Sequence, residues 1–372
     1  MRTVTEVRLD VIRSNFTRLI GQWEKWGLGQ SQGVPMVKCN GYGHGLVETA
    51  RALENLKSVV ALGVATLDEG AALRGAGIKK PIWVFSECAH INDELVQRLE
   101  KFALTPFIHD LNDLKVILEP RYRRILHGVG LHLKFNTGMN RLGIAVEAAS
   151  EARRLLESSG MRAQGLCSHL ASSEEQSAPI TRSQVKRFKA MVEVFDGHGA
   201  SYIHCSNTHA VLGEKKLGLS KICNVMRPGI GIYGYGGKTG DTLGLKPALT
   251  WKAQVLSTRT LKRGERVGYG ATYVARAGGA QAIIGVGYGD GLKRALSNHP
   301  LLISVGGRLQ KTVLTGRVSM DLASINIRSK PGDWVTLLGE GRRQGEFMAE
   351  QAETVVYEIL TSISTRVPRT HL

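Results

Sequence analysis

The chain has 372 residues, more than one typical hydrophobic core holds, and 42% of them are hydrophobic, as in an ordinary globular protein. No apolar run approaches the ~18 residues of a membrane span, and the N-terminus lacks the apolar core of a signal peptide. The formal net charge of +17 permits binding to nucleic acid, but the basic residues are scattered and no nucleic-acid motif accompanies them. We therefore expect no membrane or nucleic-acid partner, and a cytoplasmic location, or a periplasmic one if a signal peptide was removed.

The five cysteines form no CxxC pair and leave an odd count. This pattern predicts neither a disulfide framework nor a structural metal site, so we expect no metal ion. Cys39, Cys167 and Cys205 lie in or beside predicted strands, a position typical of small buried hydrophobic residues.

Short apolar runs alternate with amphipathic stretches over residues 8–238. Eight strands that alternate with helices predict a (β/α)8 barrel, in which chemistry occurs at the C-terminal ends of the strands. The fold class is therefore α/β, with an N-terminal barrel. The strands are expected at residues 34–38, 61–66, 81–85, 104–109, 132–135, 163–169, 202–206 and 226–233, and helical patterns at 46–56, 67–75, 146–158 and 180–195.

One helical pattern, at residues 67–75, has a recognisable start. Thr66 precedes it and Glu69 follows three residues later, which is the pattern of a capping box.

The residue pattern of the sequence changes after residue 238. Strand-like runs separated by glycine and polar turn residues predict a C-terminal, mainly-β domain that comprises residues 239–372 together with residues 1–7. We expect a linker at 238–241 and a final helix at 348–362. The strands of this domain are expected at 251–258, 281–286, 301–305, 312–314, 322–327 and 334–338.

Lys38 ends the first barrel strand and is followed by a glycine-rich segment that suits a sharp turn. A lysine held beside a core loses proton affinity through desolvation, and its neutral amine can form a Schiff base with a carbonyl compound. A strand-end lysine can also simply extend its amine into water, and from this stretch alone both interpretations stay open.

Other polar residues lie at or just beyond strand ends, where a barrel places its chemistry. Loops after the seventh and eighth strands of barrels often hold a phosphate, and Thr208, Gly229 and Ile230 lie there. Arg141 could grip a carboxylate with two hydrogen bonds, or could belong to a solvated loop. The strand-end residues are Lys38, Lys134, His169, Asn207 and Arg227.

Together these segments resemble the alanine racemase family, whose members are pyridoxal-phosphate enzymes with a barrel and a β domain. The resemblance covers almost the whole chain, and the motifs occur in the family's order. The family's lysine and Asn-x-Tyr-Gly-His-Gly run begin at Lys38, Thr-Gly-Met-x-Arg at Thr137, Arg-Pro-Gly-Ile at Arg227, Tyr-Gly-Ala-Thr-Tyr at Tyr269 and Gly-Arg-x-x-Met-Asp at Gly316.

The resemblance implies a racemase that interconverts L- and D-alanine with pyridoxal 5'-phosphate. Lys38 would carry the cofactor, Arg227 would donate to its pyridine nitrogen, and His169 would support Arg227. Racemisation needs a base on each face of the α-carbon, and Lys38 and Tyr269 would supply them. Tyr269 would come from a partner subunit, which implies a homodimer. The remaining cofactor-binding residues would be Tyr42, Asn207, Thr208, Gly229 and Ile230.

The resemblance also assigns residues around the substrate. Arg141 and Met320 would contact the substrate carboxylate, and Lys134 aligns with a family lysine that is often carbamylated. An access channel for the substrate would be formed by Tyr288, Arg294, Arg317 and Asp321.

One position departs from the family pattern. The family's C-terminal motif usually reads Ser-Tyr-Arg-Val-Pro-Arg, and here Thr365 replaces the tyrosine. The smaller side chain could admit a substrate larger than alanine, so a racemase of serine or of a longer amino acid is an alternative. A related barrel-type decarboxylase is a further alternative, although it should lack the Tyr-Gly-Ala-Thr-Tyr segment.

Overall fold

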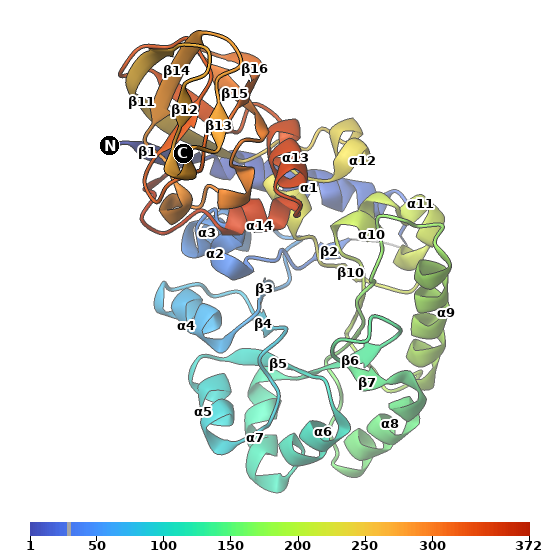
Figure 1. The fold of residues 1–372 in the computed structure, drawn as a ribbon. Coiled ribbons are helices and arrows are strands. Elements are labelled where there is room, and N and C mark those ends of the chain that lie inside the picture. The colour runs from blue at the N-terminus through green and yellow to red at the C-terminus, as the bar shows by residue number, and fades with distance from the viewer. Residues whose placement is uncertain (28–30) are drawn as a thin grey trace.

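A computed structural model describes residues 1–27 and 31–372 of the chain. Eight parallel strands form a ring surrounded by helices, with a β-rich part beside it (Figure 1). Six of them pair in the order β3-β4-β5-β6-β8-β9, β10 pairs with β2, and isolated bridges at Met36–Gly63 and Ser206–Met226 join these two groups. The predicted barrel is confirmed. Its strands are β2 (Gln32–Gly33), β3 (Leu62–Val64), β4 (Ile82–Val84), β5 (Leu104–Ile108), β6 (His132–Asn136), β8 (Gly165–Cys167), β9 (Tyr202–His204) and β10 (Val225–Met226).

Helices surround the ring (Figure 1), and the start of α4 shows how the sequence sets a helix end. The hydroxyl of Thr66 accepts a hydrogen bond from the Glu69 N–H, and the Glu69 carboxylate accepts one from the Thr66 N–H, which is the predicted capping box. The helices of this part are α1 (Leu9–Glu24), α2 (Lys38–Tyr42), α3 (Leu46–Glu54), α4 (Leu67–Gly75), α5 (Asp93–Lys101), α6 (Leu111–Ile117), α7 (Pro120–Val129), α8 (Ala149–Ser158), α9 (Pro179–Val194), α10 (Thr208–Leu212) and α11 (Glu214–Leu217).

The β-rich part is built on an eight-stranded sheet with the path β16-β15-β18-β11-β1-β19. The first strand of the chain pairs antiparallel with β11 and parallel with the last strand, so both ends of the chain lie in this sheet. The strands are β1 (Thr3–Val7), β11 (Leu249–Leu261), β14 (Gly279–Ile284), β15 (Pro300–Val305), β16 (Arg308–Val313), β17 (Ala323–Ile325), β18 (Trp334–Leu338) and β19 (Arg369–His371), with the small pair β12 (Arg266–Val267) and β13 (Tyr273–Val274) beside them.

Several predicted elements were wrong in detail. The strand predicted at 226–233 ends at Met226, because Pro228 and Gly229 interrupt it and a short 3-10 helix, η3 (Ile230–Tyr233), follows. The predicted linker at 238–241 lies within a helix, α12 (Gly237–Thr242). The predicted final helix is two helices, α13 (Arg342–Gln351) and α14 (Val356–Thr361), separated where Glu353 has a φ of 52°. Cys39 is exposed rather than buried.

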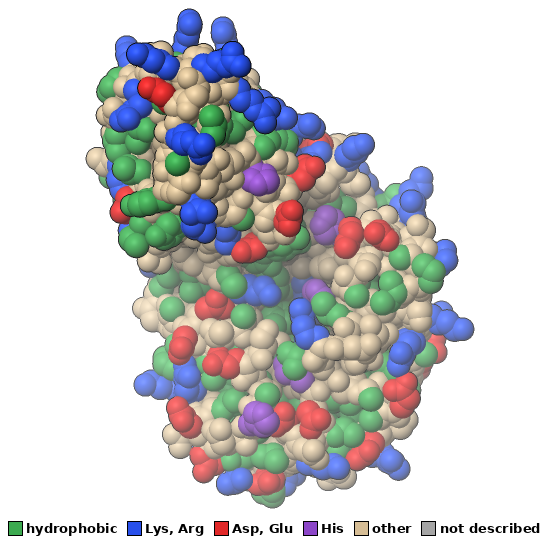
Figure 2. All heavy atoms as spheres, viewed as in Figure 1, with side chains coloured by type: hydrophobic (Ala, Val, Ile, Leu, Met, Phe, Trp, Pro, Cys, Tyr) green, Lys and Arg blue, Asp and Glu red, His purple; other side chains and the backbone are tan. Residues whose placement is uncertain are grey.

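The positive charge is concentrated at one end of the molecule rather than scattered. Residues 256–330 contain twelve Lys and Arg but only three Asp and Glu, which accounts for +9 of the net +17. Figure 2 shows these blue side chains on the outer end of the β-rich part. Among the described residues, those that are exposed there and form no ion pair include Arg259, Lys262, Arg263, Arg276, Arg308, Lys311, Arg328 and Lys330.

Candidate active site

The strand predicted at 34–38 was wrong in its bounds, because β2 ends at Gly33 and Lys38 is the first residue of α2. α2 is a turn whose backbone is left-handed over four consecutive residues. Cys39, Asn40, Gly41 and Tyr42 have φ angles of 53°, 54°, 60° and 51°. Left-handed backbone costs a non-glycine residue roughly 1–2 kcal/mol, so surrounding contacts must hold this turn. Glu69, which caps α4, accepts a hydrogen bond from the Cys39 N–H at 2.6 Å. The hydrogen bond joins the cap of α4 to the turn, which begins directly after Lys38.

A cavity of about 440 Å³ opens at the C-terminal ends of the barrel strands. It gathers ten of the residues predicted from the sequence, and residues at α14 form part of its wall. The predicted residues that line it are Lys38, Tyr42, Lys134, Arg141, His169, Asn207, Thr208, Arg227, Gly229 and Ile230.

One end of this cavity is shaped by a hydroxyl and close backbone. The Thr208 hydroxyl accepts hydrogen bonds from the N–H groups of Gly229 and Gly231, each at 3.1 Å. A Cβ atom at Gly229 would lie 2.5 Å from the Tyr42 hydroxyl, so only glycine lets this loop pass so close to the tyrosine. The Tyr42 ring itself stacks on Tyr233 at 4.9 Å. The Tyr42 and Thr208 hydroxyls both line this end of the cavity, and neither hydroxyl hydrogen is used in these bonds.

Arg227 is buried and held from several sides. Its Nη2 donates to the Ser168 carbonyl at 2.6 Å and lies 3.4 Å from Nδ1 of His169. Its Nη1 donates to Nδ1 of His204 at 2.6 Å, and the guanidinium lies over the Phe85 ring at 5.4 Å. Residues in β9 and just after β4 and β8 thus fix one charged group that lines the cavity.

The two lysines of the cavity lose proton affinity. Burial lowers the pKa of Lys38, and the positive charges of Arg141 and Arg227 add to this effect. Burial likewise lowers the pKa of Lys134 to about 8, again with help from neighbouring cations. Lys38 is therefore more readily available as a neutral, nucleophilic amine than a lysine in water.

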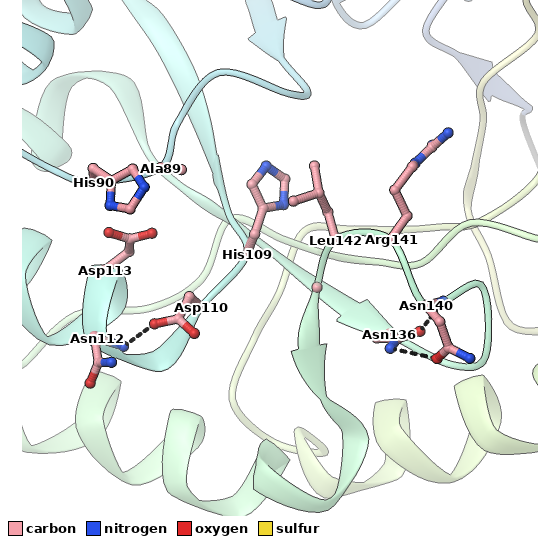
Figure 3. Close-up of a pocket in the computed structure, with 11 residues that line it drawn as sticks. Ala89, His90, His109, Asp110, Asn112, Asp113, Asn136, Asn140, Arg141 and Leu142 are labelled. Atoms are coloured by element: carbon pink, nitrogen blue, oxygen red, sulfur yellow. Dashed lines mark hydrogen bonds between the residues drawn. The ribbon is translucent and has the colours of Figure 1, made fainter.

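Arg141 lies on a loop that Asn136 organises. The Asn136 side chain accepts hydrogen bonds from the Gly138 and Asn140 N–H groups, both at 3.0 Å. Arg141 lines both the cavity beside Lys38 and a neighbouring cavity of about 660 Å³. In Figure 3, His109 lies in the middle of this second cavity, with Arg141 to one side of it.

The predicted site residues of the β-rich part lie elsewhere. Tyr269, Met320 and Tyr288 are 72%, 51% and 44% exposed, and none of them lines the cavity beside Lys38. A single chain therefore does not bring Tyr269 together with Lys38. The same holds for the other predicted residues of this part, Arg294, Arg317 and Asp321, which are all exposed.

A buried carboxylate organises the surface that carries these residues. Asp290 is 1% exposed and pairs with Arg2 at 2.9 Å and Arg366 at 2.8 Å. Both arginines also pair with Asp321. The network fixes the loop of Tyr288 against the segment 319–321. Sequence analysis missed this network because Arg2 and Asp290 are 288 residues apart, although the glycines around Asp290 were a signal.

Two residues near the cavity differ from expectation. Thr365, expected beside the substrate, lies exposed in a turn and does not line the cavity. Tyr357, which sequence analysis missed, lines it from α14, with its ring 6.0 Å from that of Tyr42. Burial raises the pKa of Tyr357 to about 12. An aromatic ring therefore still stands in the cavity wall.

Fold and site together define a barrel enzyme whose cavity at the strand ends holds a lysine of lowered pKa and a buried arginine. The chain matches the family described as "Alanine racemase, N-terminal domain" over residues 7–236 and "Alanine racemase, C-terminal domain" over residues 248–371. It therefore belongs to the alanine racemase family.

Individual relatives agree with this assignment. An alanine racemase of Carboxydothermus hydrogenoformans is 34% identical over the full length of both chains, and one of Hahella chejuensis is 33% identical over 91% of this chain and 90% of its own. The solved structure of alanine racemase from Acinetobacter baumannii is similar with a TM-score of 0.86 at 29% identity, over all of both chains. The fold and the family expected from the sequence are both confirmed.

Two features are absent from the described residues. No helix in residues 1–27 and 31–372 is long and apolar enough to cross a membrane. Over the same ranges, no cluster of three or more His, Cys, Asp or Glu residues suits a metal ion.

Proposed function

We propose that this protein is a homodimeric alanine racemase that uses pyridoxal 5'-phosphate. The observation that carries the proposal is the cavity at the barrel mouth, which joins Lys38, the hydroxyls of Tyr42 and Thr208 and the buried cation Arg227 in one space. Family membership over the full chain supports the same activity.

The residues of the cavity fit this cofactor. The Tyr42 and Thr208 hydroxyls, which line the cavity beside Gly229, are suited to donate to a phosphate. An amine of lowered pKa at Lys38 suits covalent attachment to an aldehyde. Arg227, which keeps its charge and only donates, suits a pyridine nitrogen that accepts. Tyr42, Asn207, Thr208, Gly229 and Ile230 would hold the phosphate end.

The protein's own groups would then move protons at the substrate. Bound pyridoxal phosphate supplies an electron sink that makes the α-hydrogen of the amino acid acidic. The Lys38 amine would take or return a proton on one face of the α-carbon, and the Tyr269 hydroxyl of a second subunit on the other. Arg227 would keep the ring nitrogen unprotonated, which moderates the electron sink and restrains side reactions.

Substrate binding would involve both subunits. Arg141, which lines the cavity, would take the carboxylate, together with the Met320 N–H of the partner chain. Lys134 would support Arg141, and its lowered pKa makes its amine available for carbamylation. The exposed residues Tyr288, Arg294, Arg317 and Asp321 would form the access channel from the partner's side.

The experiment that tests the function has two steps. The purified protein should show the absorbance of a bound pyridoxal cofactor, and borohydride should fix the cofactor to Lys38, as peptide mass spectrometry would show. Chiral analysis should then show interconversion of L- and D-alanine. The same assay with serine, lysine and arginine measures substrate range, and carbon dioxide release tests for decarboxylation. A labelled Lys38 without racemisation of any of these amino acids would overturn the proposal.

A further inference from the structure

Behind Arg227, the inside of the barrel holds two histidines that the proposed chemistry does not use. His132 lies on β6 and His204 on β9, and both side chains are fully buried. Nδ1 of His132 lies 2.9 Å from Nε2 of His204, and Nδ1 of His204 lies 2.6 Å from Nη1 of Arg227. The three side chains form a continuous hydrogen-bonded chain that begins inside the barrel and ends at the cavity.

The direction of each hydrogen bond follows from one property of arginine, which can only donate. Nη1 of Arg227 donates to Nδ1 of His204, so that nitrogen carries no proton. His204 must then carry its proton on Nε2 and donate it to Nδ1 of His132. His132 in turn carries its proton on Nε2. A proton on Nδ1 of either ring would place two donors against each other.

The surroundings keep both rings neutral and in place. Burial lowers the pKa of His132 to about 3, and burial and Arg227 lower the pKa of His204 well below its usual value. The Trp83 ring lies 4.2 Å from His132 and 5.1 Å from His204. A protonated ring here would add a second positive charge beside Arg227.

The backbone of the next strand is fitted to this arrangement. A Cβ atom at Gly165, on β8, would lie 2.2 Å from Nδ1 of His132. The absence of a side chain at this position therefore lets the imidazole lie against the strand and reach His204. At its other end, Nε2 of His132 and Oε1 of Gln164 are both buried and have no hydrogen-bond partner among the described residues.

We propose that His132 and His204 form a relay that positions Arg227, with His132 as its remote positioning residue. Because Nδ1 of His204 accepts from Nη1, the relay orients Nη1 inward, while Nη2 donates to the Ser168 carbonyl. Nε is then the guanidinium nitrogen without a hydrogen-bond partner among the described residues. Arg227 thus presents a fixed, fully charged donor. The consequence for the cofactor rests on the proposed function, whereas the relay itself is a property of the protein.

The first test is a direct measurement of the tautomers. Long-range 15N–1H correlation spectra of the holoenzyme, with His132 and His204 assigned by substitution, should show both rings neutral and protonated on Nε2 at pH 7. A charged ring, or a proton on Nδ1 in either ring, would overturn the relay. This result does not depend on activity, so it separates failure of the relay from failure of the proposed function.

The second test compares variants of the remote residue. His132→Phe keeps a ring but removes both nitrogens, and His132→Asn keeps an acceptor near the position of Nδ1. We expect His132→Phe to lower kcat/KM for alanine by about tenfold to 100-fold and to weaken pyridoxal phosphate binding, and His132→Asn to restore both to within about threefold of the natural protein. Gly165→Ala, which displaces the ring, should resemble His132→Phe.

A matched control distinguishes positioning from simple packing. Phe107→Leu removes a ring that lies 4.6 Å from His132 but breaks no hydrogen bond, so it should lower Tm without changing the tautomers or activity beyond about threefold. In an Arg227→Lys background, His132→Phe should change kcat/KM by less than about twofold, because the group that the relay positions is gone. Equal losses in both backgrounds would show that His132 acts only through packing, and the proposal would fail.

Discussion

Lys134 is a cation kept inside a barrel, and its cost to the fold depends on pH. Its pKa is about 8 in the folded chain, against 10.5 ordinarily, so the unfolded chain binds more protons between these values. The charged lysine therefore destabilises the fold fully below about pH 8, and the penalty disappears as the pH rises toward 10.5. The difference amounts to at most about 3 kcal/mol.

We predict that Lys134→Met stabilises the apoprotein at pH 7 by up to about 3 kcal/mol, and by much less at pH 10. Urea titrations at the two pH values measure this directly. Lys57→Met, at an exposed position, is the control and should show no such difference. A destabilisation of equal size at both pH values would contradict the assignment of a buried charge.

Tyr357, rather than Thr365, forms the aromatic wall of the cavity. We therefore expect Tyr357→Ala to raise the rate with serine and longer amino acids relative to alanine, because it enlarges the cavity. Thr365→Tyr, at an exposed position, should leave the ratio within about twofold of that of the natural protein. Rate measurements of both variants with the same amino acids show which of the two residues governs specificity. If Thr365→Tyr alone sharpens the preference for alanine, Thr365 governs specificity after all.

At the scale of elements, the turn at residues 39–45 joins the barrel to the β-rich part. Gly43 has a φ of 84°, and a Cβ there would lie 2.2 Å from the Leu360 carbonyl on α14. Arg369 also donates to the Gly43 carbonyl, at 2.8 Å. The C-terminal segment therefore supports the turn that follows Lys38.

Gly43→Ala should lower the free energy of unfolding by more than about 2 kcal/mol, since left-handed strain adds to a backbone collision. Gly77→Ala is the matched control, because Gly77 has a φ of 85° but no atom near its Cβ position. It should cost only about 1 kcal/mol. Thermal and denaturant unfolding of both variants provide the comparison, and equal losses would show that the collision is relieved without cost.

Helices and strands were predicted well where residues close in sequence set their bounds. The helix at 67–75 and the strand at 334–338 have the expected bounds, because a capping box and a strand pattern bounded by turn residues act within a few residues. The strand predicted at 226–233 was wrong, since its apolar residues are buried in a 3-10 helix rather than a strand. Hydrophobicity reports burial there but not backbone conformation.

For the whole molecule, the separation of Tyr269 from Lys38 leads to a prediction about assembly. Lys38→Ala and Tyr269→Phe should each lose activity by at least about 100-fold as pure proteins, because each removes one base. When the two are mixed and allowed to exchange subunits, mixed dimers contain one intact site, and activity should return to roughly a quarter of the natural value.

The measurement is racemase activity against time after mixing, with sedimentation to confirm dimers. A mixture of Lys38→Ala with Lys38→Ala,Tyr269→Phe has no intact site and serves as the control. If the first mixture stays as inactive as the control although subunits exchange, Tyr269 does not complete a partner's site.

The sequence by itself determined the fold class, the family and the identity of ten residues that line the cavity, because these depend on periodicity and on short motifs. It did not reveal the left-handed turn, the pairing of Arg2 with Asp290, or the histidine chain behind Arg227. These features join segments that are far apart in the chain or depend on backbone geometry, so only the tertiary structure decided them. Lys38 shows the same division: its place in the site was predictable from the motif, but its lowered pKa depends on burial and on cations from distant segments of the chain.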